Sequence, residues 1–294
     1  MRNVLPIPVL CLVLMLSSQG LAADIDWSKV DTALEKTATV QGDVHRYGIT
    51  RSDLKVTLDG VQIKPALALG GWVAFEPAAD GTMAMGDLVL TEPEVTPVMT
   101  KLLQSGIEIT ALHNHLMRAT PATFYMHIRG HGDPVKLATA IREALNESKT
   151  PFEVTPTPSQ QASLDLDTSK LDQVLGAVGK VNSGVYQFSI PRRDAVTENG
   201  MPAPAPMGTG TAINFQPTGD GKAAIAGDFV VTAEELNPMI SALRENGIEV
   251  VAIHNHMLEE QPRLFFVHFW ANDDATKLAK GLEIALEKMA VARS

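Results

Sequence analysis

Apolar and polar positions alternate along two stretches in the first half of the chain, residues 107–113 and 124–129, which are rich in β-branched and aromatic side chains. The second half repeats both stretches, at residues 248–254 and 265–270. A period of two residues is typical of a strand with one buried face. Because the two stretches of each half follow one another closely, we predict that they form a β-hairpin, once in each half.

A helix is predicted directly before each hairpin. It begins at Thr91 or Thr232, and each threonine is followed three residues later by a glutamate, Glu94 or Glu235. This pattern, with an apolar residue on either side, is a capping box with a hydrophobic staple, which satisfies the first free amides of a helix. A glycine fifteen residues after each threonine ends the helix, because glycine adopts the left-handed conformation at low cost.

The remaining elements complete one unit that occurs twice. Apolar residues at helical spacing predict a closing helix after each hairpin, at residues 134–145 and 275–289. Further strands are predicted in the first copy near residues 44–49, 72–75 and 84–90. The predicted fold class is therefore α+β, in two tandem copies of a domain that consists of an antiparallel sheet with helices beside it.

A fixed displacement of 141 residues relates the two copies. It carries residues 86–91 onto residues 227–232, and the sequence His-Asn-His at residues 113–115 onto the same sequence at residues 254–256. Two units are too few for a solenoid, so the pattern indicates a tandem pair of domains.

The segments outside the two copies have different compositions. Residues 149–163 are rich in Pro, Thr and Ser without helical periodicity, which predicts a linker between a first repeat domain at 25–148 and a second at 164–292. Residues 1–22 contain a basic residue, an apolar run and then small residues, which is the order of a secretory signal peptide. We therefore expect an exported protein, periplasmic or secreted. No stretch approaches the roughly 20 apolar residues of a membrane helix, so no integral membrane segment is expected.

Cysteine content and net charge narrow the chemistry. The single cysteine, Cys11, lies within the predicted signal peptide, so the mature chain has no thiolate to offer a metal. A soft or intermediate metal ion must then be held by imidazole, carboxylate or thioether groups. The formal net charge of −10 argues against a nucleic-acid partner, because phosphate binding needs clustered Lys and Arg.

Each copy carries one group of three histidines. The groups are His113, His115 and His127 in the first copy, and His254, His256 and His268 in the second. Side chains two apart on a strand point to one face, and a hairpin that pairs His127 with either His113 or His115 brings it to that face. Three such imidazoles suit Zn²⁺, Cu²⁺ or Ni²⁺, with a fourth position left for water, a carboxylate or a substrate. We therefore predict a metal site in each hairpin, holding zinc or copper, with a purely structural histidine network as the alternative.

Carboxylates near these histidines are the weaker candidates for chemistry. Glu259 and Glu260 lie in the second hairpin turn, where they are the candidate catalytic residues, but the first copy has Arg118 and Ala119 there. Strict alternation places Glu108 and Glu249 on the strand face opposite the histidines, which makes them poor ligands.

Two further pairs of residues are weaker candidates, and the displacement of 141 relates the two aspartates but not the two methionines, which depart from it by one position. Asp87 and Asp228 follow a glycine at the start of a strand, where a turn or cap role is expected. Met117 and Met257 lie next to the histidine strand ends and are the only methionines that we consider as thioether ligands. The other methionines are interpreted as flexible core filler.

Several blocks of the chain resemble the LppY/LpqO family of exported bacterial proteins. They are residues 227–231, 246–257 and 263–270 in the second copy, and residues 112–116 and 124–127 in the first. The first copy departs from the pattern, because Arg129 stands in place of Trp270 and Leu116 in place of Met257. The resemblance implies an exported or lipid-anchored protein, and it implies no particular reaction.

Three functions are compatible with these residues. The first is an exported, soluble binding protein that holds a transition metal, or a small ligand bound through that metal, at the histidine clusters. The second is a metal-dependent hydrolase, in which a bound ion lowers the pKa of water and Glu259 or Glu260 moves the proton. The third is an interaction module in which the histidines are purely structural. If only one cluster is functional, we expect it to be the second, which has Phe266 and Trp270 nearby.

Overall fold

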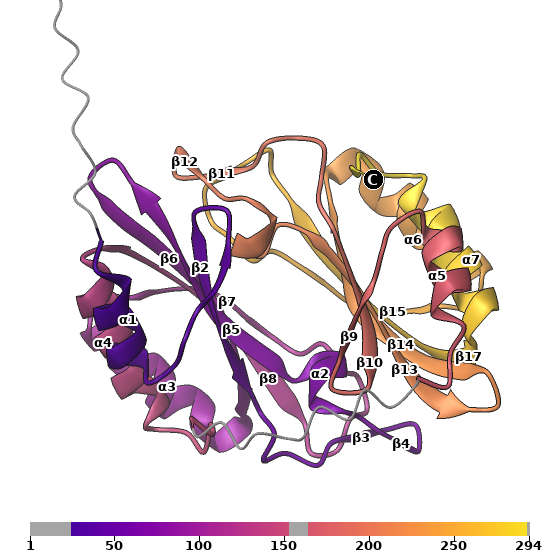
Figure 1. Cartoon of the computed structure of the whole chain (residues 1–294), viewed down its shortest axis with the longest axis horizontal. Helices are drawn as coiled ribbons and strands as arrows, with labels where there is room; N and C mark the ends of the chain where they lie inside the picture. Colours follow the sequence, from indigo (N-terminus) through magenta and orange to yellow (C-terminus); the bar gives the residue numbers. More distant parts are fainter. Residues whose placement is uncertain (1–24, 153–163, 293–294) are drawn as a thin grey trace, which may run out of the picture.

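A computed structural model describes residues 25–152 and 164–292 of the chain (Figure 1). The predicted signal peptide and most of the predicted linker lie outside the described residues. Two six-stranded sheets face each other, and each carries its helices on the outer side (Figure 1). Among the described helices none is long and apolar enough to cross a membrane.

The first copy forms an antiparallel sheet with the strand order β1-β2-β5-β6-β8-β7. Its strands are β1 (Thr39–Gln41), β2 (Val44–Thr50), β5 (Gly70–Ala78), β6 (Gly81–Thr91), β7 (Glu108–His113) and β8 (Thr123–Gly132). The helices of its outer layer are α1 (Trp27–Leu34), α3 (Glu92–Gln104) and α4 (Pro134–Leu145). Apolar side chains from these helices and from one face of the sheet make a core that belongs to this copy alone.

The second copy repeats this arrangement, with the strand order β15-β17-β14-β13-β10-β9. Its strands are β9 (Lys180–Asn182), β10 (Val185–Ile190), β13 (Thr211–Gly219), β14 (Lys222–Val231), β15 (Glu249–His254) and β17 (Phe265–Asp274). Its helices are α5 (Thr168–Leu175), α6 (Ala233–Glu245) and α7 (Ala275–Leu286). The predicted α+β fold in two tandem copies is thus confirmed.

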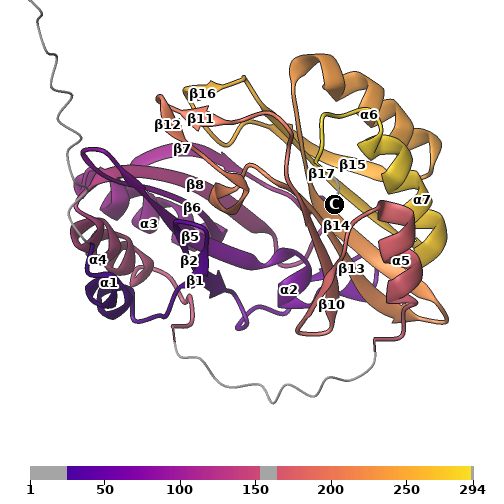
Figure 2. The ribbon, with the colours of Figure 1, turned by 45° about the horizontal axis from the view of Figure 1, so that its top comes forward.

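Each copy extends a short arm over the other copy. The first arm consists of β3 (Thr57–Leu58), β4 (Val61–Gln62) and α2 (Pro65–Ala68), and α2 contacts β13 and β14 of the second copy. The second arm consists of β11 (Thr197–Glu198), β12 (Met201–Pro202) and the 3₁₀ helix η1 (Ala205–Met207). Here η1 contacts β2 and β5 of the first copy, and β11 pairs with β16 (Glu260–Gln261). The two arms lie at different ends of the interface in the turned view (Figure 2).

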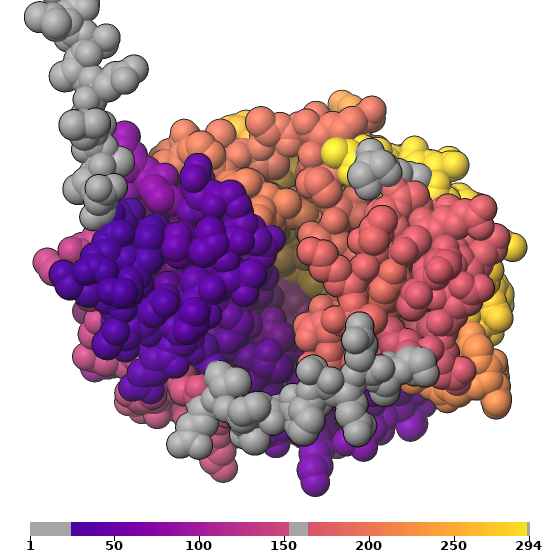
Figure 3. Space-filling model, viewed as in Figure 1, coloured from indigo at the N-terminus to yellow at the C-terminus, as the bar shows by residue number. Residues whose placement is uncertain are grey.

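The inner faces of the two sheets are also buried. Two apolar clusters mix residues of both copies: one joins Leu116 and Tyr125 to Trp270, and the other joins Met85 to Met257 and Phe266. In the space-filling view the two copies meet along the middle of the molecule, with a hollow between them on this face (Figure 3). Each sheet is therefore covered on both sides, by its own helices and by the other copy.

The capping boxes that begin α3 and α6 are confirmed. In each, the threonine side chain accepts from the third helical amide while the glutamate accepts from the threonine amide. The glycines after these helices have positive φ, +76° at Gly106 and +74° at Gly247, as the sequence predicted.

The glutamates of the capping boxes have a second role. Arg51, only 1% exposed, donates to Glu94 at 2.7 Å and to the Val89 carbonyl at 3.0 Å. Arg192 binds Glu235 at 2.7 Å in the same way in the second copy. In each copy, one buried arginine thus connects the residues after one strand (β2 or β10) with the central strand (β6 or β14) and with the first turn of the helix (α3 or α6).

Candidate metal centre

The two histidine trios meet at the interface and form one group. The ring centroids of three cross-copy pairs lie 3.4–3.7 Å apart: His113 with His254, His115 with His268, and His127 with His256. The structure differs here from the expectation of a separate site in each hairpin. We call the six histidines together with Asp87 and Asp228 the polar centre.

The strand pairing explains how each trio reaches one face. In the first hairpin His127 lies opposite Ala111, and His113 lies opposite Tyr125. Neither predicted register is observed, although the shared face is. The cause lies in the connection between the strands, where Thr120 exchanges both backbone hydrogen bonds with Thr57 of the first arm, each at 2.9 Å. Because the connection pairs with the first arm, it is not a tight hairpin turn. His127 therefore lies opposite a residue nearer to the start of the first strand than either predicted partner.

Two aspartates complete the polar centre. In the sheet register Asp87 lies opposite His127, and Asp228 lies opposite His268. The Asp87 carboxylate is 3.8 Å from Nε2 of His127, while that of Asp228 is 3.6 Å from Nε2 of His268 and 3.9 Å from Nε2 of His256. The expected turn or cap role is therefore wrong. The displacement of 141 residues that relates the two histidine trios also relates Asp87 to Asp228. This recurrence was the signal in the sequence that could have identified the two aspartates.

The polar centre is buried, and several of its polar atoms lack a hydrogen-bond partner. His115, His127, His256 and His268 are each less than 9% exposed. Within the described residues, nine buried side-chain atoms of the centre have no hydrogen-bond partner. They are Oδ1 of Asp87 and Asp228, Nδ1 of His113, and Nε2 of all six histidines. Buried polar groups are nearly always paired in folded proteins, so such a concentration marks a candidate site for a bound ion.

Burial sets the protonation of these groups. It lowers the pKa of His113 to about 3 and the pKa of His254 to about 4. It also raises the pKa of Asp87 to about 7 and the pKa of Asp228 well above its usual value, in the latter case with a contribution from the charge of Asp87. Neutral imidazole, which is the form that binds metals, is thus the form that this interior favours.

Two overlapping sets of ligand atoms lie close enough to hold an ion. His113, His115, His254 and His256 each offer an atom within 4.8 Å of the others. Asp228, His256 and His268 make the second set by the same measure. The first set combines residues of the two copies, whereas the second set belongs to the second copy alone.

The predicted catalytic residues lie elsewhere. Glu259 has a side chain 57% exposed and lies 3.6 Å from Arg129. Glu260 is fully buried, binds Arg263 at 3.0 Å and accepts from the Leu264 amide. Neither glutamate belongs to the metal-holding sets of the described residues.

Ion pairs close the interface at two places, which we name rims. At the first rim, Arg118 binds Asp59 and Glu249. At the second rim, Arg129 binds Glu108 at 2.6 Å and Glu198 at 2.8 Å.

These rims correct the expected orientation of Glu108 and Glu249. Each lies opposite a residue of the histidine face, Arg129 or Trp270, because a bulge interrupts the alternation between Ile109 and Ala111 and between Val250 and Ala252. A bulge adds one residue to one strand and so exchanges its faces.

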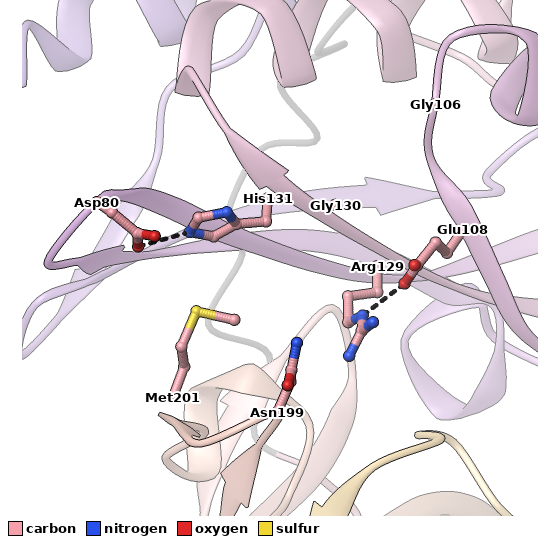
Figure 4. Close-up of a pocket in the computed structure, with 8 residues that line it drawn as sticks. All are labelled: Asp80, Gly106, Glu108, Arg129, Gly130, His131, Asn199 and Met201. Atoms are coloured by element: carbon pink, nitrogen blue, oxygen red, sulfur yellow. Dashed lines mark hydrogen bonds and ion pairs between the residues drawn. The ribbon is translucent and has the colours of Figure 1, made fainter.

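A pocket of about 420 Å³ opens beside the second rim (Figure 4). Glu108, Arg129 and His131 line it from the first copy, and Asn199 and Met201 from the second arm. His131 and Asp80, which both line this pocket, form an ion pair at 3.2 Å on one side of it (Figure 4).

The two methionines considered as ligands differ. Met117 is 49% exposed at the surface. Met257 is only 1% exposed and lines a cavity of about 10 Å³ together with His127 and His256.

The chain matches one family of known proteins. The family described as Domain of Unknown Function (DUF1259) matches residues 28–147 and again residues 169–288, and the chain belongs to this family. No curated protein matches.

Two solved structures have a low similarity to this chain. A trimeric bacterial microcompartment shell protein, PduB, has 15% identity and a TM-score of 0.21, over 87% of this chain and 95% of its own. EtuB from Clostridium kluyveri has 10% identity and a TM-score of 0.19, over 86% and 89% of the two chains.

Proposed function

We propose that this protein is an exported binding protein that holds a transition metal ion, zinc or copper, at the polar centre between its two copies. The observation that carries the proposal is the set of nine buried nitrogen and oxygen atoms without hydrogen-bond partners among the described residues. Each unmade hydrogen bond costs about 1–3 kcal/mol, and a cation that accepts these lone pairs removes several such costs at once.

The donor set supports a transition metal over a harder ion. Six imidazoles and two carboxylates match zinc or copper, whereas calcium and magnesium prefer oxygen ligands throughout. The histidine rings contact each other by stacking. The hydrogen bond from Nδ1 of His254 to the Asn255 carbonyl, at 3.3 Å, is made to a neighbouring residue. A structural network would instead satisfy these nitrogens.

The surroundings favour binding over hydrolysis. A metal hydrolase keeps a coordination position open to its substrate and a base beside it. Here the cavity that touches His127 and His256 has about 10 Å³, which is room for about one water. Glu259 and Glu260, the expected bases, form ion pairs with Arg129 and Arg263 instead.

Metal analysis of untagged protein tests this proposal. Wild type is expected to carry a transition metal, and the triple variant H113A/H115A/H127A is expected to lose the ion of the set that spans both copies, because His113 and His115 share that ion with His254 and His256. The variant H254A/H256A/H268A should lose it equally. His131→Ala, outside the polar centre, is the control and should retain the metal.

Two results would contradict the proposal. Metal-free wild type with unchanged folding in both triple variants would make the histidines structural. Retention of half the metal in each triple variant would restore two separate sites, one in each copy.

Export is part of the proposal and rests on the N-terminal residues 1–22. The resemblance to the LppY/LpqO family also supports it. If residues 1–22 are removed on export, the single cysteine, Cys11, is removed with them. The metal must then be held by imidazole, carboxylate or thioether groups, which the polar centre supplies.

A further inference from the structure

One side of the polar centre is lined by thioethers. The cavity of about 10 Å³ is bounded by His127, His256 and by three methionines, Met85, Met207 and Met257. Both imidazoles have Nε2 without a hydrogen-bond partner among the described residues. Methionine sulfur is a weak hydrogen-bond acceptor, so these walls suit a water molecule poorly and a soft cation well.

The methionines belong to one half of the pseudosymmetric interface. The displacement of 141 places Ala226 where the first copy has Met85, and Leu116 where the second copy has Met257. Ala226 and Leu116 lie together in the other apolar cluster, around Tyr125 and Trp270. The chain thus contains a thioether-lined side and an aliphatic side around one set of histidines.

We propose that the cavity between His127, His256 and the methionines is a site for a soft monovalent cation, Cu(I), which Ag(I) can replace. This inference rests on the proposed function of the polar centre and specifies the class of its metal. Imidazole and thioether donors together select Cu(I) over Zn²⁺, because Cu(I) is the softer ion. The size of the cavity, about 10 Å³, matches one ion without a water shell.

Competition titrations test the site directly. Cu(I), supplied under anaerobic conditions, Ag(I) and Zn²⁺ are each titrated into metal-free protein against a chromophoric chelator. The double variant M85L/M257L should lower the affinity for Cu(I) and Ag(I) about tenfold or more and leave the Zn²⁺ affinity nearly unchanged. X-ray absorption of the Cu(I)-loaded wild type should show a sulfur ligand, which the double variant should lose.

Met83→Leu is the matched control. Met83 is fully buried in the same apolar cluster as Met85 and Met257 but does not line the cavity, so its change should leave all three affinities as in wild type. Leucine conserves the volume of methionine, and thermal unfolding verifies that each variant folds.

The outcomes separate the two proposals. Wild type that binds Zn²⁺ or Cu²⁺ but not Cu(I) overturns this inference and leaves the binding function intact. An unchanged Cu(I) affinity in the double variant, or an equal loss of Zn²⁺ affinity, also overturns it. Wild type that binds none of these ions overturns both.

Discussion

The two copies agree at the polar centre and differ at the rims. Both copies place an aspartate on the central strand opposite a histidine, Asp87 with His127 and Asp228 with His268. At the rims, however, Arg129 occupies the position of Trp270, and Arg118 occupies that of Glu259. The retained residues lie at the polar centre, and the altered ones lie where the two copies form ion pairs.

The residues that differ between the copies make the charges of the interface asymmetric, and we call this asymmetry the direction of the interface. Both rim arginines belong to the first copy, and each binds a glutamate of the second: Arg118 binds Glu249, and Arg129 binds Glu198. Two first copies facing each other would bring Arg118 towards Arg129, while two second copies would gather carboxylates. Complementary charge of this kind suppresses the wrong pairing, so the tandem chain favours its own mixed interface.

The largest effect is expected where the copies agree most, at the buried ion pairs. Arg51→Met and Arg192→Met should each lower the free energy of unfolding by about 3–5 kcal/mol, because a buried glutamate loses its partner. Urea denaturation measures this loss. Similar values for both variants would confirm that the copies share one structural device, whereas a loss in only one copy would separate them.

Acidification gives an independent check on the same pair. The guanidinium of Arg51 and two backbone amides lower the pKa of Glu94 to about 2, against the strong effect of burial. The stabilisation is therefore complete above the ordinary pKa of about 4.5 and is lost as the pH falls towards 2. The difference between wild type and Arg51→Met should shrink over this range. Lys277→Ala, which breaks an exposed pair with Asp273, should leave the midpoint unchanged at every pH.

Much of the fold was accessible from the sequence. The capping boxes, the glycines that end the helices and the strands of the hairpins have local signals in the sequence. Each was confirmed because its physical cause lies within a few residues. The repeat in the sequence predicted that the α+β unit occurs twice. It also marked Asp87 and Asp228, although a local interpretation assigned them to turns.

The union of the two trios was not accessible from the sequence. It depends on the packing of one sheet on the other, and no periodicity within a strand encodes that contact. The bulge before Ala111 was missed for a similar reason, since it leaves the run of residue types in the strand unchanged. The arms were missed as well, because their strands, such as Thr57–Leu58, are too short to show alternation.

An intermediate effect is expected at the glycines that precede the two aspartates. A Cβ at Gly227 would lie 2.0 Å from the Ala212 carbonyl oxygen, which is backbone, whereas one at Gly86 would lie 3.0 Å from Ile128 and from the Trp72 carbonyl. Gly227→Ala should therefore cost about 1–3 kcal/mol of unfolding free energy, and Gly86→Ala clearly less. Equal unfolding midpoints for the two variants would refute this difference.

The effects at the two rims should be unequal, and the smallest effect of all is expected at Arg118. Arg129→Ala leaves Glu198, which is fully buried, without its arginine, and should cost about 1–3 kcal/mol of unfolding free energy. Arg118→Ala removes ion pairs with Asp59 and Glu249, whose side chains are 42% and 35% exposed, so water replaces the lost contacts and the effect should be much smaller. Urea denaturation of both variants at low and high salt measures the contrast: added salt should erase the effect of Arg118→Ala and leave most of that of Arg129→Ala, since a buried pair is screened less. If the two arginines prove equivalent, burial does not distinguish the rims, and the direction of the interface rests on net charge alone.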